Sequence, residues 1–214
     1  MTSVRICFVG DSLIVGTNDY EFTGWPGRLA QRETAAGHDI SIYNLGIRAD
    51  TSDLIAARWR AECEVRLPDF HPGALVFSYG VNDMAILDGK IRVPLARSLE
   101  IARAMMSEAQ DWKPTLWVGP QPCDDDQQPF RAGAGIEYNF ACNRTAELSA
   151  AYAELARELS IPYLDLFTPL AADANWIQMF RPGDGVHPVA AGYALIAERV
   201  AAWDAWRTWF DGSE

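Results

Sequence analysis

Short apolar runs alternate with segments of helical periodicity along nearly the whole chain, and this alternation limits the fold more than any other feature. Runs of four to six residues lack room for helical periodicity and are typical of parallel strands buried on both faces. Five such strands are predicted, at residues 6–9, 40–45, 74–79, 115–118 and 161–165. Strands that alternate with helices predict an α/β fold, with a parallel sheet covered by helices on both faces.

The segments between these strands carry helix signals. Pro26 suits the first turn of a helix and Gly37 its end. We predict helices at about 25–36, 54–67, 93–112, 136–159, 166–174 and 188–210. The aromatic residues of the last helix are predicted core residues, with a homodimer or lipid contact as the alternative. They are Trp203, Trp206, Trp209 and Phe210.

Composition places the chain among ordinary globular proteins. Its 214 residues, 49% hydrophobic and 22% charged, predict a single domain over 1–214. A formal net charge of −11 repels phosphate backbones and anionic lipid heads, so neither nucleic acid nor a stable membrane association is expected. No targeting segment precedes the first strand, and no apolar run approaches the ~20 residues of a membrane span, so the expected location is cytoplasmic.

No cofactor or metal is expected. The four cysteines are widely separated, without a Cys-x-x-Cys pair or a Cys/His cluster, and are predicted to be reduced thiols. Residues 119–135 form the least regular stretch, and they include the acidic triplet 124–126. We favour a solvated turn over a calcium loop for this triplet, because the glycine and closing glutamate of such a loop are lacking.

Gly10-Asp11-Ser12 ends the first predicted strand. Residues at the carboxyl end of a central parallel strand lie where open α/β sheets place their chemistry. Asp and Ser are also favoured helix N-caps, so this tripeptide alone is compatible with a structural cap. Both a cap and a nucleophile remain open at this point.

Only three histidines are available to act as a base. His38 lies in a turn after a helix and His71 in a connector flanked by proline, and both are expected at the surface. His187 lies in a glycine-rich loop just before the last helix, three residues after Asp184. Such a turn can fold the Asp184 carboxylate onto Nδ1 of His187, which leaves Nε2 free to take a proton from a hydroxyl. The alternative is that this pair only shapes the start of the helix.

Four short blocks occur in the order found in GDSL, or SGNH, hydrolases, and the chain resembles that family over most of its length. The blocks are Gly10-Asp11-Ser12, Asn44-Leu45-Gly46, Gly80-Val81-Asn82-Asp83 and Asp184-Gly185-Val186-His187. The resemblance implies a flavodoxin-like three-layer α/β/α sandwich with a five-stranded parallel sheet. Beyond Gly-Asp-Ser-Leu-Ile, the first block offers no further family-like residues, so the subgroup stays open.

The resemblance also implies the site residues. Ser12 is the expected nucleophile, His187 the general base and then acid, and Asp184 the orienting carboxylate. The expected oxyanion donors are the backbone N–H groups of Ser12 and Gly46 and the side-chain amide of Asn82. Asp11 and Asp83 are expected to brace these loops.

The expected function is hydrolysis of a carboxylic ester through an acyl-enzyme. Acyl transfer to, or deacetylation of, a sugar or other small alcohol is an alternative, and a flavodoxin-like module that binds phosphate or flavin is the rival from another class. No Gly-x-Ser-x-Gly, phosphate-loop or dinucleotide motif occurs. Residues 83–92 and 119–135 are expected to shape the pockets, since both follow strands at the catalytic edge, and their composition suggests a small or neutral ester.

Overall fold

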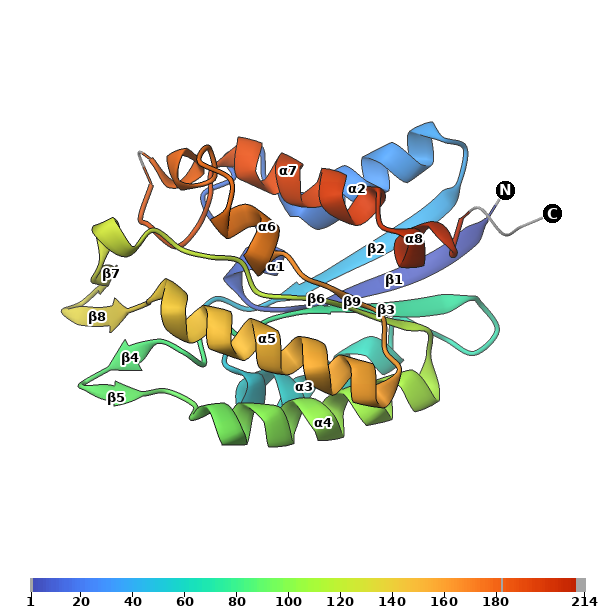
Figure 1. The fold of residues 1–214 in the computed structure, drawn as a ribbon. Coiled ribbons are helices and arrows are strands. Elements are labelled where there is room, and N and C mark those ends of the chain that lie inside the picture. The colour runs from blue at the N-terminus through green and yellow to red at the C-terminus, as the bar shows by residue number, and fades with distance from the viewer. Residues whose placement is uncertain (1, 182, 211–214) are drawn as a thin grey trace.

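The computed structural model describes residues 2–181 and 183–210, and its centre is a parallel sheet of five strands (Figure 1). These strands are β1 (Ser3–Gly10), β2 (Asp39–Gly46), β3 (Gly73–Ser78), β6 (Thr115–Val118) and β9 (Tyr163–Leu164). Their order across the sheet is β2-β1-β3-β6-β9, and every pairing is parallel. Counted along the chain this is the order 2-1-3-4-5 of flavodoxin, so the predicted strands, their parallel arrangement and the fold class are confirmed.

Helices cover both faces of the sheet and produce three layers, as Figure 1 shows. One face packs against α2 (Gly24–Ala35), α6 (Phe167–Ala171), α7 (Ala190–Ala201) and α8 (Asp204–Arg207). The other face packs against α3 (Ser52–Glu64), α4 (Leu95–Trp112) and α5 (Cys142–Leu159). The remaining helical elements are α1 (Ser12–Val15), η1 (Asp125–Gln127) and η2 (Ile177–Phe180). In the described part of the chain, no helix combines the length and the apolar character needed to cross a membrane.

The central strands are buried on both sides because their side chains are apolar on both sides. In β1, Ile6 and Phe8 point into the core beneath α2 and α7, whereas Cys7 and Val9 point into the core beneath α3 and α4. Continuous burial of this kind is expected for a parallel strand with helices on both faces. It holds the carboxyl end of β1 rigidly, which matters because Ser12 follows directly.

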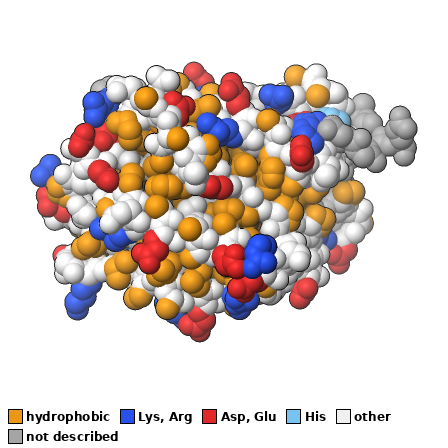
Figure 2. All heavy atoms as spheres, viewed as in Figure 1, with side chains coloured by type: hydrophobic (Ala, Val, Ile, Leu, Met, Phe, Trp, Pro, Cys, Tyr) orange, Lys and Arg blue, Asp and Glu red, His pale blue; other side chains and the backbone are white. Residues whose placement is uncertain are grey.

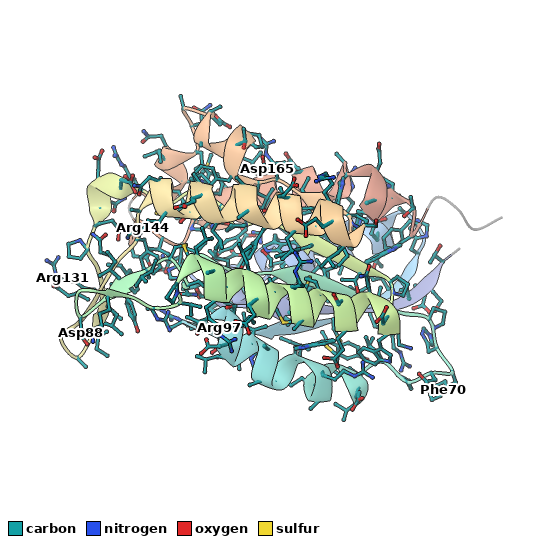
Figure 3. All side chains as sticks on the ribbon, turned by 60° about the horizontal axis from the view of Figure 1, so that its bottom comes forward. Phe70, Asp88, Arg97, Arg131, Arg144 and Asp165 are labelled. Carbon is teal, nitrogen blue, oxygen red and sulfur yellow. The ribbon has the colours of Figure 1, made fainter. Side chains whose placement is uncertain are left out.

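A second, smaller sheet stands at one end of the molecule, opposite the chain termini (Figure 1). Its order is β5-β4-β8-β7, and it consists of two hairpins that extend from β3 and from β6. The strands are β4 (Ile86–Leu87), β5 (Lys90–Ile91), β7 (Phe130–Gly133) and β8 (Ile136–Asn139). Asp88 and Arg131, which belong to these hairpins, lie far from Phe70 at the other end of the molecule (Figure 3).

This sheet corrects two sequence predictions. Residues 136–139 were predicted as the start of a helix but form β8, and α5 begins only at Cys142. The stretch 119–135, expected to be irregular, contains η1 and β7. Arg144 near the start of α5 (Figure 3) holds both hairpins, since its guanidinium donates to the carbonyl oxygens of Met84 and Asn139 at 2.8 and 2.6 Å.

The predicted terminal helix is divided into α7 and α8, because Trp203 is extended between them with φ −77° and ψ 126°. The turn directs Trp206 inward, where its indole N–H donates to the buried carboxylate of Glu33 at 3.0 Å. Trp206 and Phe210 are buried core residues, as predicted, whereas Trp203 and Trp209 are only partly buried and pack against the same core. A homodimer through this segment stays a prediction.

On the face shown in Figure 2, acidic and basic side chains are dispersed among apolar ones.

Candidate active site

Ser12 lies directly after the turn that ends β1, as the first residue of α1. Asp11 is the N-cap of this short helix, and its Oδ1 accepts the Leu13 N–H at 2.9 Å. The capping alternative therefore applies to Asp11, and the Ser12 side chain is left for other contacts. Gly10 is required here, since a Cβ at this position would lie 1.9 Å from the Ser78 carbonyl oxygen on β3.

His187 reaches Ser12 from the loop that precedes α7. Its Nε2 lies 2.8 Å from Ser12 Oγ, and its Nδ1 lies 2.7 Å from Asp184 Oδ2. Asp184 Oδ1 in turn accepts the backbone N–H groups of Val186 and His187 at 3.0 and 2.8 Å. An ionised carboxylate can only accept hydrogen bonds, so the Nδ1 atom that faces Asp184 carries the proton. The neutral imidazole therefore presents an unprotonated Nε2 to the serine hydroxyl.

The charge on Asp184 is stabilised in place. Burial alone would raise the pKa of this carboxyl, but the hydrogen bond and charge of His187 together with two backbone N–H groups lower it to about 2. Asn18 adds a further donor, with its Nδ2 at 3.1 Å from Asp184 Oδ2. Sequence reasoning missed Asn18, which lies 166 positions away and belongs to none of the four blocks.

The predicted oxyanion donors gather at the same strand ends but in different states. Asn82 directs Nδ2 at Asp11 Oδ2, 3.1 Å away, which uses one of its two amide hydrogens and leaves the second free to donate elsewhere. Ser12 N–H has no acceptor among the described residues. Gly46 N–H donates to Asn44 Oδ1 at 3.1 Å, so this third donor is already engaged in the free protein.

Gly46 is a glycine for a reason that the sequence did not reveal. A Cβ at this position would lie 2.6 Å from the Asp11 carbonyl oxygen and 2.7 Å from the Val15 nitrogen. The end of β2 thus packs directly against the backbone of α1, and its close approach fixes the helix that carries Ser12. Asn44 strengthens this contact by donating to the Ile14 carbonyl at 2.6 Å.

Two buried carboxylates brace these loops, as predicted. Burial raises the pKa of Asp11 to about 6, against the partial compensation of hydrogen bonds from Leu13 and Asn82. Asp83 accepts the Ser52 backbone N–H and the Ser98 hydroxyl, both at 2.7 Å, and burial raises its pKa too. Arg58, which the sequence reading missed, joins the ends of β1 and β2 by donating to the carbonyls of Gly10 and Leu45.

A small pocket of about 80 Å³ opens beside Ser12 and His187. Its walls are mostly apolar, and the aromatic ones come from the small sheet and the residue after it. They are Phe130, Tyr138 and Phe140. The Phe130 ring stands edge-on to the His187 ring with centroids 5.8 Å apart. Of the two loops expected to shape the site, 119–135 contributes Phe130 and Ala132 to this wall, and none of residues 83–92 lines this pocket.

The other two histidines lie away from Ser12, but both are half-buried and not at the surface as predicted. His38 precedes β2 and His71 precedes β3, so both are at the amino ends of the strands, whereas Ser12 is at the carboxyl ends. Three possible metal ligands that are separated in the sequence come together in the structure. Within residues 2–181 and 183–210, Cys123, Asp125 and Cys142 bring their ligand atoms within 4.8 Å of one another.

A protein-family model describing GDSL-like lipases and acylhydrolases matches residues 8–195. The chain belongs to this GDSL-like family. The match includes all four blocks, and so it spans the serine, the histidine and both intervening strand ends. Comparison with curated protein sequences gives no match.

Solved structures of the GDSL-like type share the fold. A lipase/acylhydrolase from Enterococcus faecalis superimposes with a TM-score of 0.74 at 23% identity, over 95% of this chain and 96% of its own. The psychrotrophic esterase EstA from Pseudoalteromonas sp. gives 0.68 at 18% identity, over 97% and 98%. An acetyl xylan esterase, AlAXEase, gives 0.68 at 15% identity, over 92% and 98%.

Proposed function

We propose that this GDSL-like hydrolase is a serine esterase that cleaves short-chain carboxylic esters through an acyl-enzyme on Ser12. The observation that carries the proposal is the continuous hydrogen-bond chain from Ser12 Oγ through His187 to Asp184, with distances of 2.8 and 2.7 Å, beside an apolar pocket. A serine is activated when an oriented base lies within hydrogen-bond reach. A binding module for phosphate or flavin has no need of this chain of contacts.

In the proposed reaction, His187 Nε2 takes the Ser12 hydroxyl proton while Oγ attacks the ester carbonyl. The tetrahedral oxyanion is held by Ser12 N–H and the free hydrogen of Asn82 Nδ2, and His187 returns the proton to the departing alcohol. Water activated by the same Nε2 then releases the acid. Gly46 N–H is the third donor and would exchange Asn44 Oδ1 for the oxyanion.

The pocket volume supports a small acyl group. About 80 Å³ is roughly half of the ~150 Å³ of an engineered cavity that admits benzene. Acetyl fits such a space, whereas an octanoyl chain would require the aromatic wall to move. The acetyl xylan esterase among the structural neighbours acts on acetyl esters according to its name, which agrees with this size limit.

The test is hydrolysis of p-nitrophenyl acetate together with labelling by a fluorophosphonate probe. Ser12→Ala should abolish both while its unfolding curve remains that of the parent. Ser3→Ala is the matched control, because Ser3 lies at the opposite end of β1 and should leave both readouts unchanged. Parental activity in Ser12→Ala would refute the proposal.

Deacetylation of a sugar, or transfer of its acetyl group to another alcohol, is the second candidate. The same small acyl pocket favours it, because the acyl-enzyme can be intercepted by any hydroxyl that reaches His187. Acetylated oligosaccharide substrates and an added alcohol acceptor, with products separated by mass, distinguish transfer from hydrolysis. Free acid as the sole product would reject transfer.

A further inference from the structure

Two thiols far apart in the sequence meet beside the active-site loops. Cys123 lies after β6 and Cys142 is the first residue of α5, yet their sulfur atoms are 4.0 Å apart. Asp125 completes the group, with Oδ1 at 3.9 Å from Cys123 Sγ and at hydrogen-bond distance, 2.9 Å, from the Cys142 backbone N–H. Cys123 is buried, Cys142 is half-buried and Asp125 is exposed, so solvent reaches the group from one side.

The spacing is close to that of a tetrahedral metal site. Two sulfur ligands at 2.3 Å from zinc and at the tetrahedral angle are about 3.8 Å apart, and a sulfur and an oxygen ligand are about 3.5 Å apart. The observed separations of 4.0 and 3.9 Å need only small side-chain adjustments to reach these values. Cys142 stands at the amino end of a long helix, which favours the thiolate form that a metal requires.

Within the acidic triplet 124–126, Asp125 differs from its two neighbours in its contacts. Arg181 lies 3.4 Å from Asp124 and 3.7 Å from Asp126, so those two carboxylates have a cation nearby. No lysine or arginine of the described ranges 2–181 and 183–210 forms an ion pair with Asp125. Its oxygens instead face a backbone N–H and the two thiols, which is an arrangement suited to a cation between them.

We propose that Cys123, Asp125 and Cys142 form a Zn²⁺ site, with water in the fourth position. Binding replaces the two thiol protons by one metal ion, and the backbone N–H of Cys142 orients Asp125 as an outer hydrogen bond. A disulfide would also use the two sulfurs, and reduction before the titration excludes it from the test. Cys123 and Cys142 are reduced, as predicted, and the proposal gives the two thiols a shared ligand.

The metal would fasten the segment that forms the acyl pocket. Residues 123–142 close a loop that contains β7 and β8, from which Phe130 and Tyr138 reach the pocket. Cys123 also packs with Leu13 and Val186, the neighbours of Ser12 and His187. Zinc therefore joins the two ends of this loop without touching the reacting atoms, and it is expected to raise the unfolding temperature by linkage.

Cobalt is the probe of choice, because a tetrahedral Co²⁺ site with sulfur ligands gives intense visible bands and a sulfur-to-cobalt charge-transfer band. The full chain is reduced with a phosphine, freed of metal and titrated with Co²⁺ without oxygen. We expect saturation at about one ion per chain and displacement of the spectrum by Zn²⁺. Weak, octahedral-type absorption alone, or no displacement by Zn²⁺, would overturn the site.

Three variants locate the ligands. Cys142→Ser keeps a donor for the Cys123 carbonyl, which Cys142 Sγ contacts at 2.9 Å, but should weaken Co²⁺ binding more than about tenfold. Asp125→Asn should also weaken it while still accepting the Cys142 N–H. Cys63→Ala, in the core beneath α3, is the matched control and should bind as the parent does.

Each variant is first compared with the parent by metal-free thermal unfolding, so that loss of binding is not loss of fold. Unchanged binding in Cys142→Ser, or loss in Cys63→Ala, would overturn the proposal. The proposal would also be overturned if Cys123 and Cys142 form a disulfide that reductant removes and the reduced chain shows no cobalt spectrum. The cobalt readout does not depend on esterase activity, so its failure and failure of the esterase proposal are separate results.

Discussion

Replacing Asp11 by asparagine tests how the buried carboxylate behind Ser12 serves both stability and catalysis. Asp11 is fully buried, its Oδ1 caps α1 and its Oδ2 holds the Asn82 amide. Burial raises its pKa from 3.8 to about 6, and 2.2 units at 1.36 kcal/mol per unit correspond to about 3 kcal/mol. The free energy of unfolding therefore decreases by about this amount when Asp11 ionises in the folded protein.

The sign of the pH dependence follows from proton binding. Between the unfolded pKa of 3.8 and the folded pKa of about 6, the native state holds a proton that the unfolded chain has lost. The contribution of Asp11 to stability therefore decreases as pH rises across this range. Asp11→Asn has no such proton, so the wild-type free energy of unfolding minus that of the variant should fall by about 3 kcal/mol from about pH 3 to about pH 7, and by about 2 kcal/mol of this between pH 4 and pH 6.

The substitution removes the cost of ionising a buried carboxyl, but it should lower kcat. With the variant's amide oxygen kept on the Leu13 N–H, its NH₂ group faces Asn82 Nδ2, and two donors cannot pair. The Asn82 amide must then rotate and turn its oxygen toward the variant side chain, which displaces the donor proposed for the oxyanion. Loss of one such donor costs about 10²–10³ in kcat.

The assays are urea unfolding followed by tryptophan fluorescence at several pH values, and kcat for p-nitrophenyl acetate at neutral pH. Asn82→Ala and the double variant complete a cycle, in which the double variant should be no slower than Asn82→Ala alone. A stability difference that is independent of pH would refute the electrostatic reasoning. If the fold losses in kcat of the two single variants multiply in the double variant, Asp11 does not act through Asn82.

Three further perturbations test the neighbouring parts of the site. Asp184→Asn should lower kcat about 10⁴-fold, because an amide NH₂ facing Nδ1 favours the wrong imidazole tautomer. The wild-type Asp184 carboxyl has a pKa of about 2, below 3.8, so the stability it contributes should be present above about pH 4 and lost toward pH 2 in acid-unfolding curves. Gly46→Ala places a Cβ 2.6 Å from the Asp11 carbonyl and should lower the free energy of unfolding in urea by about 1–3 kcal/mol. Displacement of Ser12 should reduce kcat about 100-fold. A parental kcat would reject a role of Gly46 in positioning Ser12. Phe130→Ala should enlarge the pocket, so the ratio of kcat/KM for butyrate over acetate esters should rise, and an unchanged ratio would place the acyl chain elsewhere.

The sheet and the contact between Asp184 and His187 could be predicted from the sequence because their signals are local. A parallel strand buried on both faces is a continuous apolar run, and β1 shows this pattern directly. Asp184 and His187 are three residues apart, so a single turn brings them together without any knowledge of the fold. The pairing with Ser12, 175 positions away, was expected from the resemblance to GDSL hydrolases and not from any local pattern.

The small sheet could not be read in the same way, because its pairing is non-local. Ile136 and Tyr138 alternate with polar residues, but four residues are too few to separate a strand from the start of the helix that follows. What decides the conformation is pairing of β8 with β4, whose Ile86 lies opposite Asn139. One local signal was present: Gly133 and Gly135, with φ of 89° and 78°, flank Ala134 and allow the tight hairpin turn.

Contacts that hold the site were missed for a related reason. Asn18, Asn44 and Arg58 are ordinary polar residues whose roles depend on which backbone groups remain unpaired at the strand ends. A sequence shows the residues that react, since chemistry restricts their types, but the residues that position them can be of many types. Their identification required the coordinates.

Gly10 and Gly46 show how the site depends on backbone contact as much as on side chains. The two glycines are paired across β1 and β2, and each lacks a Cβ that would strike a main-chain atom, of β3 for Gly10 and of α1 for Gly46. Between them, they bring three strand ends and the first turn after β1 into direct contact. Ser12 is held in that turn through backbone contacts, with no long side chain in between. The β7–β8 hairpin, which lines the pocket beside Ser12, is attached outside this contact, so residues of the pocket wall can change without moving Ser12.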